Sequence, residues 1–244
     1  MISKSEIKQT ASLAVKKYRD ELGLFTVEGE KLVEEALASG FEVLHVWRIE
    51  EIGEDAMKRI SSLSSPSPVL AVVRKPAGDS SRASGADLGK SLSGLVLALD
   101  SVRDPGNLGT IIRLADWFGI RRIIASRDTV DLYNPKVVQA TMGSIFRVGV
   151  SYCNLPEVLK ATSLPVYGTF LEGSDIYSQE LSPEGVLVMG SERDGISPEV
   201  EAQVSGRLFI PPFASGPQAR TSESLNVAIA TAICCSEFRR RKFQ

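Results

Sequence analysis

The chain has few of the side chains that bind metals or form disulfide frameworks. Its 244 residues include 3 cysteines and 1 histidine. The adjacent Cys234 and Cys235 fall in a predicted helix, where neighbouring side chains point in different directions, so we expect neither a disulfide nor a zinc site. The lone His45 lies in the alternating run Val-Leu-His-Val-Trp, which is typical of a strand. Without a second histidine, a serine-hydrolase triad of the usual kind is disfavoured, and we expect no bound metal.

The chain also lacks a long hydrophobic run and an excess of basic charge. No apolar stretch approaches the ~20 residues that a membrane span requires, and the first residues are polar, so we expect a cytoplasmic protein without a membrane partner. Lys plus Arg total 28 against 30 Asp plus Glu, a net charge of −2. Proteins that bind nucleic acid through phosphates usually have a basic surface, so any such surface here must be local. The candidate positions are residues 4, 8, 16, 17, 121, 122 and 239–242.

Composition and length predict two domains. Hydrophobic residues make up 43% and charged residues 24%, as in ordinary globular proteins. Residues 77–94 are rich in Gly, Ser and Ala and have no sustained periodicity, which indicates a flexible linker. We therefore expect one domain over residues 1–76, a linker over 77–94 and a second domain over 95–244.

The first domain is predicted to be a small α/β unit. Hydrophobic periodicity predicts helices at residues 3–19, 30–38 and 55–63, and strands at residues 24–27, 43–47 and 69–73. These helices and strands alternate along the chain, which is typical of a layered α/β arrangement.

The second domain is predicted to hold a parallel sheet covered by helices on both faces. Short apolar runs predict strands at residues 95–99, 122–125, 147–151, 166–170, 186–189 and 208–210. Helices are expected between them at residues 107–118, 135–144, 156–161, 198–204 and 225–239. The last helix has almost no polar face, so we expect it to be buried all round. The turn Gly-x-Gly-x-x-Gly is absent after the first strand, which disfavours a dinucleotide-binding domain.

Three junctions between a strand and a helix carry polar motifs. They read Asp-Pro-Gly-Asn-Leu-Gly-Thr-Ile-Ile-Arg at residues 104–113, Met-Gly-Ser-Glu-Arg-Asp-Gly-Ile-Ser at 189–197, and Ser-Leu-Asn-Val at 224–227. Ligands of open α/β sheets bind where strands give way to helices, so we expect one composite site.

Each motif has residues suited to a particular task. Asn107 is expected to cap its helix, and Arg113 lies off the apolar stripe of that helix, where it could face a phosphate or an oxyanion. An ordinary surface ion pair of Arg113 with Asp116 or another carboxylate is the alternative. Gly190 and Gly195 allow a close backbone approach or a positive φ, and Ser197 with the following proline can begin a helix.

As a set, these motifs resemble those of the SpoU (TrmH-type) branch of the SPOUT RNA methyltransferases. The resemblance covers about residues 95–238. It implies a knotted parallel-sheet α/β domain with a C-terminal trefoil knot, S-adenosylmethionine as cofactor, and a ribose 2′-hydroxyl of RNA as methyl acceptor. It also implies a homodimer with active sites at the subunit interface. Residues 25–36 resemble part of the small RNA-binding domain, similar to ribosomal protein L30e, that precedes many SpoU catalytic domains. A stabilising or dimerising role for residues 1–76 is the alternative.

The resemblance also implies roles for individual residues. The implied catalytic residues are Asn107, Arg113, Glu192, Ser224 and Asn226. The implied cofactor-binding residues are Thr169, Gly190, Ile210 and Leu225. One departure concerns residues 212–223, which form a longer loop than the family usually has, so the role of Gly216 within it stays open and a lid is one interpretation of the loop.

The sequence leaves the RNA and the reaction partly open. Ribosomal and transfer RNA both fit, and the added first domain favours large-subunit (23S-type) ribosomal RNA. Two other functions stay open, namely a non-catalytic RNA-binding protein that kept the fold and a SPOUT enzyme that methylates a base. Cys234 could suggest a nucleophile for the latter, but its place among apolar helix residues predicts a core position.

Overall fold

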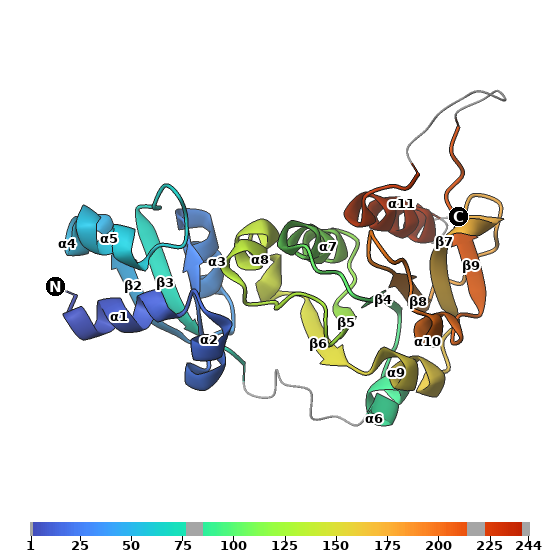
Figure 1. Cartoon of the computed structure of the whole chain (residues 1–244), viewed down its shortest axis with the longest axis horizontal. Helices are drawn as coiled ribbons and strands as arrows, with labels where there is room; N and C mark the ends of the chain where they lie inside the picture. The colour runs from blue at the N-terminus through green and yellow to red at the C-terminus, as the bar shows by residue number, and fades with distance from the viewer. Residues whose placement is uncertain (1, 77–84, 214–222, 241–244) are drawn as a thin grey trace. The chain divides into compact units, whose positions relative to one another are not determined.

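The computed structural model describes residues 2–76, 85–213 and 223–240. By its contacts the chain forms two units, Met1–Asp79 with Asp131–Arg147, and Ser80–Val130 with Val148–Gln244. The predicted division at the linker did not foresee that Asp131–Arg147 would group with the first unit. Each unit builds its own sheet (Figure 1).

The first unit has a three-stranded antiparallel sheet in the order β1-β3-β2. Its strands are β1 (Leu24–Glu28), β2 (Val43–Arg48) and β3 (Val69–Arg74). Its helices are α1 (Lys4–Ser12), α2 (Lys16–Leu22), α3 (Glu30–Ala38), α4 (Ile49–Ile52), α5 (Glu54–Ile60), α8 (Pro135–Thr141) and the 3-10 helix η1 (Ser144–Phe146). The three strands and α3 confirm the predictions, and His45 lies in β2 as expected.

The single helix predicted over residues 3–19 is wrong, because the chain breaks it into α1 and α2. Arg19 lies in α2 with only 2% of its surface exposed, and its Nη1 donates to the carbonyl oxygens of Leu13 and Ala14 at 2.8 and 2.9 Å. Those carbonyls lie in the break, where no helical N–H reaches them, so the guanidinium supplies the missing donors. A periodic apolar pattern could not reveal this polar requirement.

The segment Asp131–Arg147 is fixed within the first unit by charge and ring contacts. Nη2 of Arg19 donates to Oδ2 of Asp131 at 2.7 Å. The rings of Phe25 and Tyr133 lie 4.6 Å apart between centroids, which is in the range of favourable aromatic pairs. Arg147 forms an ion pair with Glu35 of α3. This segment therefore belongs structurally to the first unit although its sequence lies between two strands of the second.

The second unit has a six-stranded sheet in the order β6-β5-β4-β8-β7-β9, and all its described strand pairs are parallel. Its strands are β4 (Leu95–Leu99), β5 (Arg122–Ser126), β6 (Gly149–Cys153), β7 (Val166–Asp175), β8 (Gly185–Met189) and β9 (Gly206–Phe209). Its helices are α6 (Gly85–Lys90), α7 (Pro105–Trp117), α9 (Leu155–Ala161), α10 (Pro198–Glu201) and α11 (Val227–Arg240). The predicted parallel α/β domain is confirmed.

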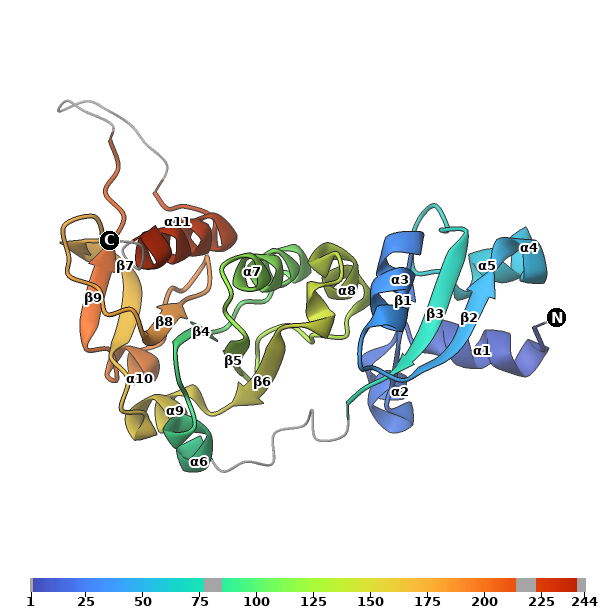
Figure 2. The same cartoon turned by 180° about the vertical axis from the view of Figure 1, so that it is seen from behind.

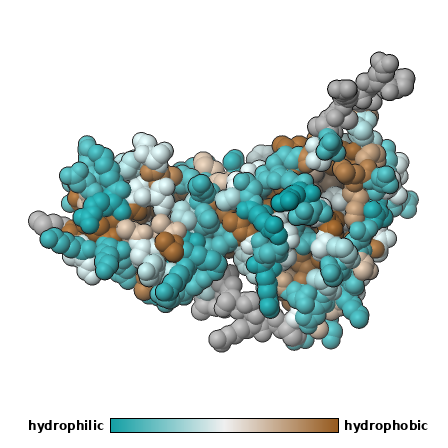
Figure 3. Space-filling model, in the orientation of Figure 1, coloured by the Kyte–Doolittle hydropathy of each residue, from teal (hydrophilic) through white to brown (hydrophobic). Residues whose placement is uncertain are grey.

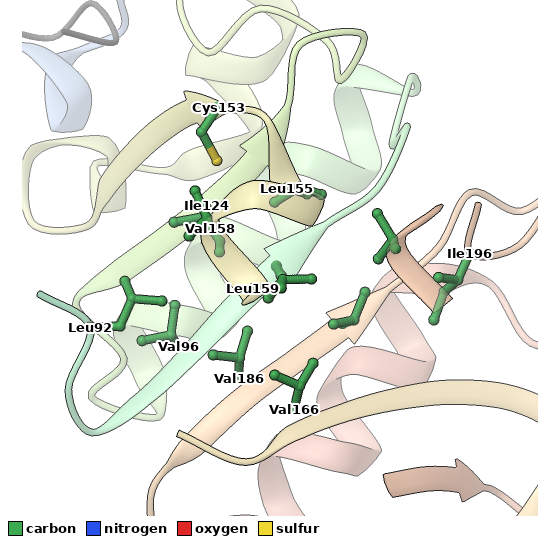
Figure 4. Packing of buried hydrophobic residues seen from close by; sticks show 13 residues of the cluster. Leu92, Val96, Ile124, Cys153, Leu155, Val158, Leu159, Val166, Val186 and Ile196 are labelled. Carbon is green, nitrogen blue, oxygen red and sulfur yellow. The ribbon is translucent and has the colours of Figure 1, made fainter. Parts of the chain in front are cut away.

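Helices cover both faces of this sheet. Helices α7 and α11 lie on one face, and α6, α9 and α10 lie on the other (Figures 1 and 2). On the second face, Val158 and Leu159 of α9 pack against side chains that alternate along the strands, including Val96, Ile124 and Val186 (Figure 4). Burial on both faces explains why the strands read as continuous apolar runs in the sequence.

Part of the predicted linker is structured. Residues 85–90 form α6, which packs on α9, and a Cβ at Gly89 would overlap the backbone carbonyl of Val158. Only a glycine allows this close approach. Gly89, which suggested a flexible linker in the sequence, therefore allows α6 to pack closely on α9. The knot implied for the C-terminal segment stays a prediction.

Helix α11 is not buried all round in the single chain. Ile229 is 54% exposed, whereas Cys234 and Cys235 are fully buried.

Hydrophobic residues also occur as separate brown areas on the face of the molecule seen in Figure 3. Among the described helices, none has the length and apolar character needed to cross a membrane.

Candidate active site at the carboxyl edge of the parallel sheet

The sheet topology places a switch point at β4. The chain passes from β4 to β5 on one side, whereas β8 pairs with β4 on the other side. Where the strand order reverses in this way, the loops at the carboxyl ends of the strands separate and leave room for a ligand. The motifs that follow β4 and β8 are the two that border this position.

Helix α7 begins two residues earlier than predicted, and Asn107 is not its cap. The side chain of Asp104 accepts a hydrogen bond from the backbone N–H of Asn107 at 2.8 Å, and Pro105 occupies the first turn. Asp104 is thus the N-cap. Pro105 fits the first turn because the backbone N–H that proline lacks would have no helical partner at that position. As a result, the side-chain amide of Asn107 is free to contact other elements.

Three side chains from three elements form a closed hydrogen-bonded set. Oδ1 of Asn226 accepts from the backbone N–H groups of Ala228 and Ile229 at 3.0 and 3.3 Å, at the start of α11. These backbone donors fix the orientation of the Asn226 amide, whose Nδ2 donates to Oδ1 of Asn107 at 3.0 Å and to Oε1 of Glu192 at 2.7 Å. Nδ2 of Asn107 also donates to Oε1 of Glu192, at 2.6 Å.

This set leaves one carboxylate oxygen available. Oε1 of Glu192 receives both amide donors, and no described residue donates to Oε2. An ionised carboxylate accepts hydrogen bonds at both oxygens, so Oε2 can accept a proton or a hydroxyl donor from a substrate. The sequence predicted that Asn107, Glu192 and Asn226 would share a site, and the structure brings these three together.

The loop that carries Glu192 is closed on itself. Ser191 and Gly195 exchange two backbone hydrogen bonds of 3.0 Å. Gly195 has φ +71°, and a Cβ at Gly190 would overlap the backbone of Gly195 and Ile196. Both predictions for these glycines are confirmed, the positive φ at Gly195 and the close approach at Gly190.

Asp100 fixes the same loop to the end of β4, and sequence reasoning missed it. This buried residue accepts from both the backbone N–H and the Oγ of Ser197, each at 2.7 Å from Oδ2. Its own N–H donates to the carbonyl of Met189 at 2.9 Å. A carboxylate directly after five buried apolar residues was the available signal, because a buried charge needs such partners. Ser197 begins α10 as predicted.

Two of the predicted catalytic residues stand apart from the hydrogen-bonded set. Arg113 and Ser224 are exposed, and within the described ranges neither makes a hydrogen bond or an ion pair. The alternative pairing of Arg113 with Asp116 is therefore not formed. An Arg without a partner keeps all its donors for a ligand, at the cost of a less fixed position.

The predicted cofactor positions lie at the same edge of the sheet. Thr169 is near the carboxyl end of the paired part of β7, and its Oγ1 donates to the carbonyl of Val188 at 3.3 Å. Ile210 follows β9, and Leu225 precedes α11 with 44% of its surface exposed. Gly216 lies outside the described residues. Exposed apolar side chains beside backbone polar groups suit a ligand that has both an aromatic part and a polar part.

The fold and the site together define an α/β protein with a ligand site at the switch point of a parallel sheet. Residues 94–236 match the family model described as SpoU rRNA Methylase family, and residues 4–52 match the MRM3-like substrate binding domain. The chain belongs to the SpoU rRNA methylase family. The resemblance identified from the motifs is thereby confirmed.

Individual relatives agree with this assignment. The chain is 32% identical to 23S rRNA (guanosine(2553)-2′-O)-methyltransferase RlmP of Bacillus subtilis, over 93% of each chain. It is similar to the structure of a putative RNA methyltransferase of the TrmH family from Porphyromonas gingivalis, with 41% identity, a TM-score of 0.84 and 99% of both chains covered. An AdoMet-bound rRNA methyltransferase from Sinorhizobium meliloti is 31% identical with a TM-score of 0.82, and covers 99% of this chain and 97% of its own.

Proposed function

We propose that the chain transfers a methyl group from S-adenosylmethionine to a ribose 2′-hydroxyl of large-subunit ribosomal RNA. The protein is an RNA methyltransferase of the SpoU family. The observation that carries the proposal is the set formed by Asn107, Glu192 and Asn226, because it presents an open carboxylate oxygen at the switch point of the sheet. Ribosomal RNA is preferred over transfer RNA because RlmP of Bacillus subtilis bears the name of a 23S rRNA enzyme and matches nearly the whole chain. We propose a cytoplasmic location, because RlmP is the enzyme of a bacterium.

The residues present suit S-adenosylmethionine. Leu225 and Ile210 offer apolar surface for a purine ring, and the closed loop after Gly190 lies at the same edge of the sheet. Thr169 adds a hydroxyl at the end of β7. When bound, the cofactor supplies an activated methyl group on a sulfonium. We propose no role for a metal.

The protein's own task is to handle a proton and a negative charge. A ribose hydroxyl is a very weak acid, so its proton must leave as the new C–O bond forms. We propose that Oε2 of Glu192 accepts this proton while Arg113 stabilises the charge that develops on the ribose oxygen. Arg113 itself is an unsuitable base because a guanidinium stays protonated in proteins. Asn107 and Asn226 hold Glu192 in the orientation that this transfer requires.

Glu192→Gln tests where the proton goes. If Glu192 is the base, single-turnover methylation should fall strongly and its pH dependence should flatten, while cofactor affinity stays near that of the wild type. Near-normal activity of this variant would contradict the role and point to an RNA phosphate as the acceptor.

The protein is proposed to act as a homodimer through the second unit. Trp117 of α7 is 85% exposed and Ile229 of α11 is 54% exposed, although both lie on helices that pack against each other. Large apolar side chains left exposed on neighbouring helices mark a protein interface. Trp117→Glu and Ile229→Glu should produce monomers in sedimentation velocity. Leu37→Glu, a change at an equally apolar and 57% exposed position of the first unit, should leave the dimer intact, and dimeric Trp117→Glu and Ile229→Glu variants would contradict this interface.

Residues 1–76 are proposed to bind the RNA substrate, with 77–94 joining them to the catalytic domain of residues 95–244. The match of residues 4–52 to a substrate-binding domain model supports this role. The basic run at residues 239–242 supports RNA binding less than its sequence suggested. Arg239 donates to the carbonyl of Phe118 at 2.7 Å, and Arg240 pairs with Glu237 at 2.7 Å, so both serve the fold.

Two measurements test the proposed function against its alternatives. Calorimetric titration with S-adenosylmethionine should show binding, and a non-catalytic RNA-binding protein would show none. Incubation of an unmodified 23S ribosomal RNA transcript with the cofactor, followed by mapping of the modified nucleotide, should find a methyl group on a ribose oxygen. A methyl group on a base would identify the other SPOUT reaction, and an unmodified transcript would contradict the proposed substrate.

A further inference from the structure

A polar network lies beside the active site at the carboxyl ends of β4 and β5, and the proposed mechanism does not use it. Asp128 is its centre. Oδ2 of Asp128 accepts from Oγ of Ser101 at 2.6 Å, and its Oδ1 accepts from Oγ of Ser126 at 2.7 Å. The backbone N–H of Ser101 donates to the Oγ of Ser126 at 2.8 Å. These bonds connect the loop after β4 with the loop after β5.

The network holds a strained backbone position. Ser101 has φ +61°, in the left-handed region that residues other than glycine rarely adopt. Such a conformation persists where the surroundings impose it, and it is more frequent at functional sites than elsewhere. The hydrogen bonds of Ser101 to Ser126 and Asp128 are the contacts that impose it here. They fix the course of the chain immediately before α7 and its residue Asn107.

The same network orients a guanidinium group toward solvent. Nη2 of Arg103 donates to Oδ2 of Asp128 at 3.2 Å, while 65% of the Arg103 side chain stays exposed. Arg103 directly precedes Asp104, the N-cap of α7, and is four residues from Asn107. No other described residue accepts from it, so most of its N–H donors face the solvent next to the site. An ion pair this exposed contributes little stability, so orientation of the guanidinium is its main effect.

A second exposed guanidinium lies at this position. Arg127 is exposed beside Asp128 and pairs with no described residue. Two guanidinium groups, one held by Asp128 and one without a described partner, thus lie at this position. The hydrogen bonds from Ser101 and Ser126 hold the pKa of Asp128 down to about 2, so the carboxylate is charged at neutral pH and can keep Arg103 in place.

We infer that Arg103, oriented by Asp128 and assisted by Arg127, binds a backbone phosphate of the RNA strand that enters the active site. The inference rests on the proposed RNA substrate. A guanidinium suits a phosphate because its parallel N–H groups match two phosphate oxygens. A side chain already oriented by an ion pair loses less conformational entropy on binding than an unrestrained one. Asp128 therefore acts as a positioning residue for Arg103. The chain thereby gains a local phosphate contact despite its net charge of −2.

Binding of an unmodified 23S ribosomal RNA transcript at several salt concentrations tests this assignment. Arg103→Ala should weaken binding by about 10-fold, as expected for a lost charge-assisted contact. The slope of log affinity against log salt should fall by about 0.7–0.9, the value for one phosphate contact. The affinity for S-adenosylmethionine and the melting temperature should not change. Arg122→Ala is the matched control. Arg122 was a candidate basic position in the sequence, but the structure places it exposed at the amino end of β5, on the edge of the sheet opposite the active site.

Asp128→Asn separates positioning from simple charge. Removal of a negative charge near RNA would by itself strengthen binding, whereas loss of the group that orients Arg103 should weaken it. Weaker binding of both variants supports the assignment. RNA binding by Arg103→Ala within twofold of Arg122→Ala, or tighter binding by Asp128→Asn, would overturn it. Because binding is measured apart from methylation, a wild-type chain that binds this transcript without methylating it would contradict the proposed reaction and still decide the role of Arg103.

Discussion

The side-chain amide of Asn226 donates to Oε1 of Glu192 at 2.7 Å while its carbonyl oxygen accepts from the first N–H groups of α11. One residue therefore caps a helix and orients the carboxylate that we propose as the base. The start of α11 and the active site depend on the same side chain. A substitution of Asn226 should therefore change both the stability of the helix and the rate of methyl transfer.

Asn226→Ala should reduce both stability and methyl transfer. Loss of a helix cap costs about 1 kcal/mol, measured as the free energy of unfolding in urea. Single-turnover methylation should fall as well, because Glu192 loses a donor. Ser3→Ala is the control, since Ser3 caps α1 by accepting from Glu6 at 3.2 Å. It should cost a similar free energy and leave methylation unchanged, and equal activity of the two variants would contradict the coupling.

Gly190→Ala should weaken binding of S-adenosylmethionine. An added Cβ would overlap the backbone of Gly195 and Ile196, so the loop that carries Glu192 would have to move. Calorimetric titration should show a clear loss of affinity. Gly40→Ala provides the comparison, because a Cβ at Gly40 meets no atom within 4 Å. Unchanged affinity in Gly190→Ala would show that the closed loop takes no part in cofactor binding.

Arg19→Ala should destabilise the first unit by about 3 kcal/mol, because it leaves Asp131 and two backbone carbonyls without their donor. Lys16→Ala removes an exposed ion pair with Asp20 and should cost about 0–1 kcal/mol. Urea unfolding followed by circular dichroism measures both. Similar small losses in the two variants would mean that the segment Asp131–Arg147 does not depend on Arg19.

Cys234 should prove to be a core residue without a chemical role. Burial raises its pKa to about 12, so the thiol stays protonated and unreactive up to about pH 11. We expect slow reaction with a thiol reagent in the native protein at pH 8. Cys234→Ala should cost about 1 kcal/mol of stability and retain full methyl transfer. Loss of methylation without loss of folding in this variant would support a base-methylating enzyme instead.

Much of the second unit could be predicted because its signals are local. The strand over residues 95–99 matches β4, and the alternation of apolar runs with helices led directly to the parallel sheet. Three of the five predicted catalytic residues meet in one hydrogen-bonded set, because motifs that follow parallel strands come together at one edge.

The errors concern polar contacts that an apolar periodicity does not report. The break between α1 and α2 depends on Arg19, and the place of residues 131–147 depends on contacts with the first unit. Asn107 was expected to cap α7 because asparagine favours that position, but Asp104 occupies it. The contact that Asn107 makes instead is with Glu192, 85 positions further along the chain, which no local pattern reveals.

The central claim is that Arg113 stabilises the charge that develops on the ribose oxygen. Single-turnover methylation of an unmodified 23S ribosomal RNA transcript at saturating S-adenosylmethionine tests it most directly. Arg113→Ala should lower the rate by about 10²-fold or more, the scale for loss of one oxyanion-stabilising group, with melting temperature and cofactor affinity unchanged. A fully active Arg113→Ala enzyme would contradict the claim and reduce Arg113 to a surface residue.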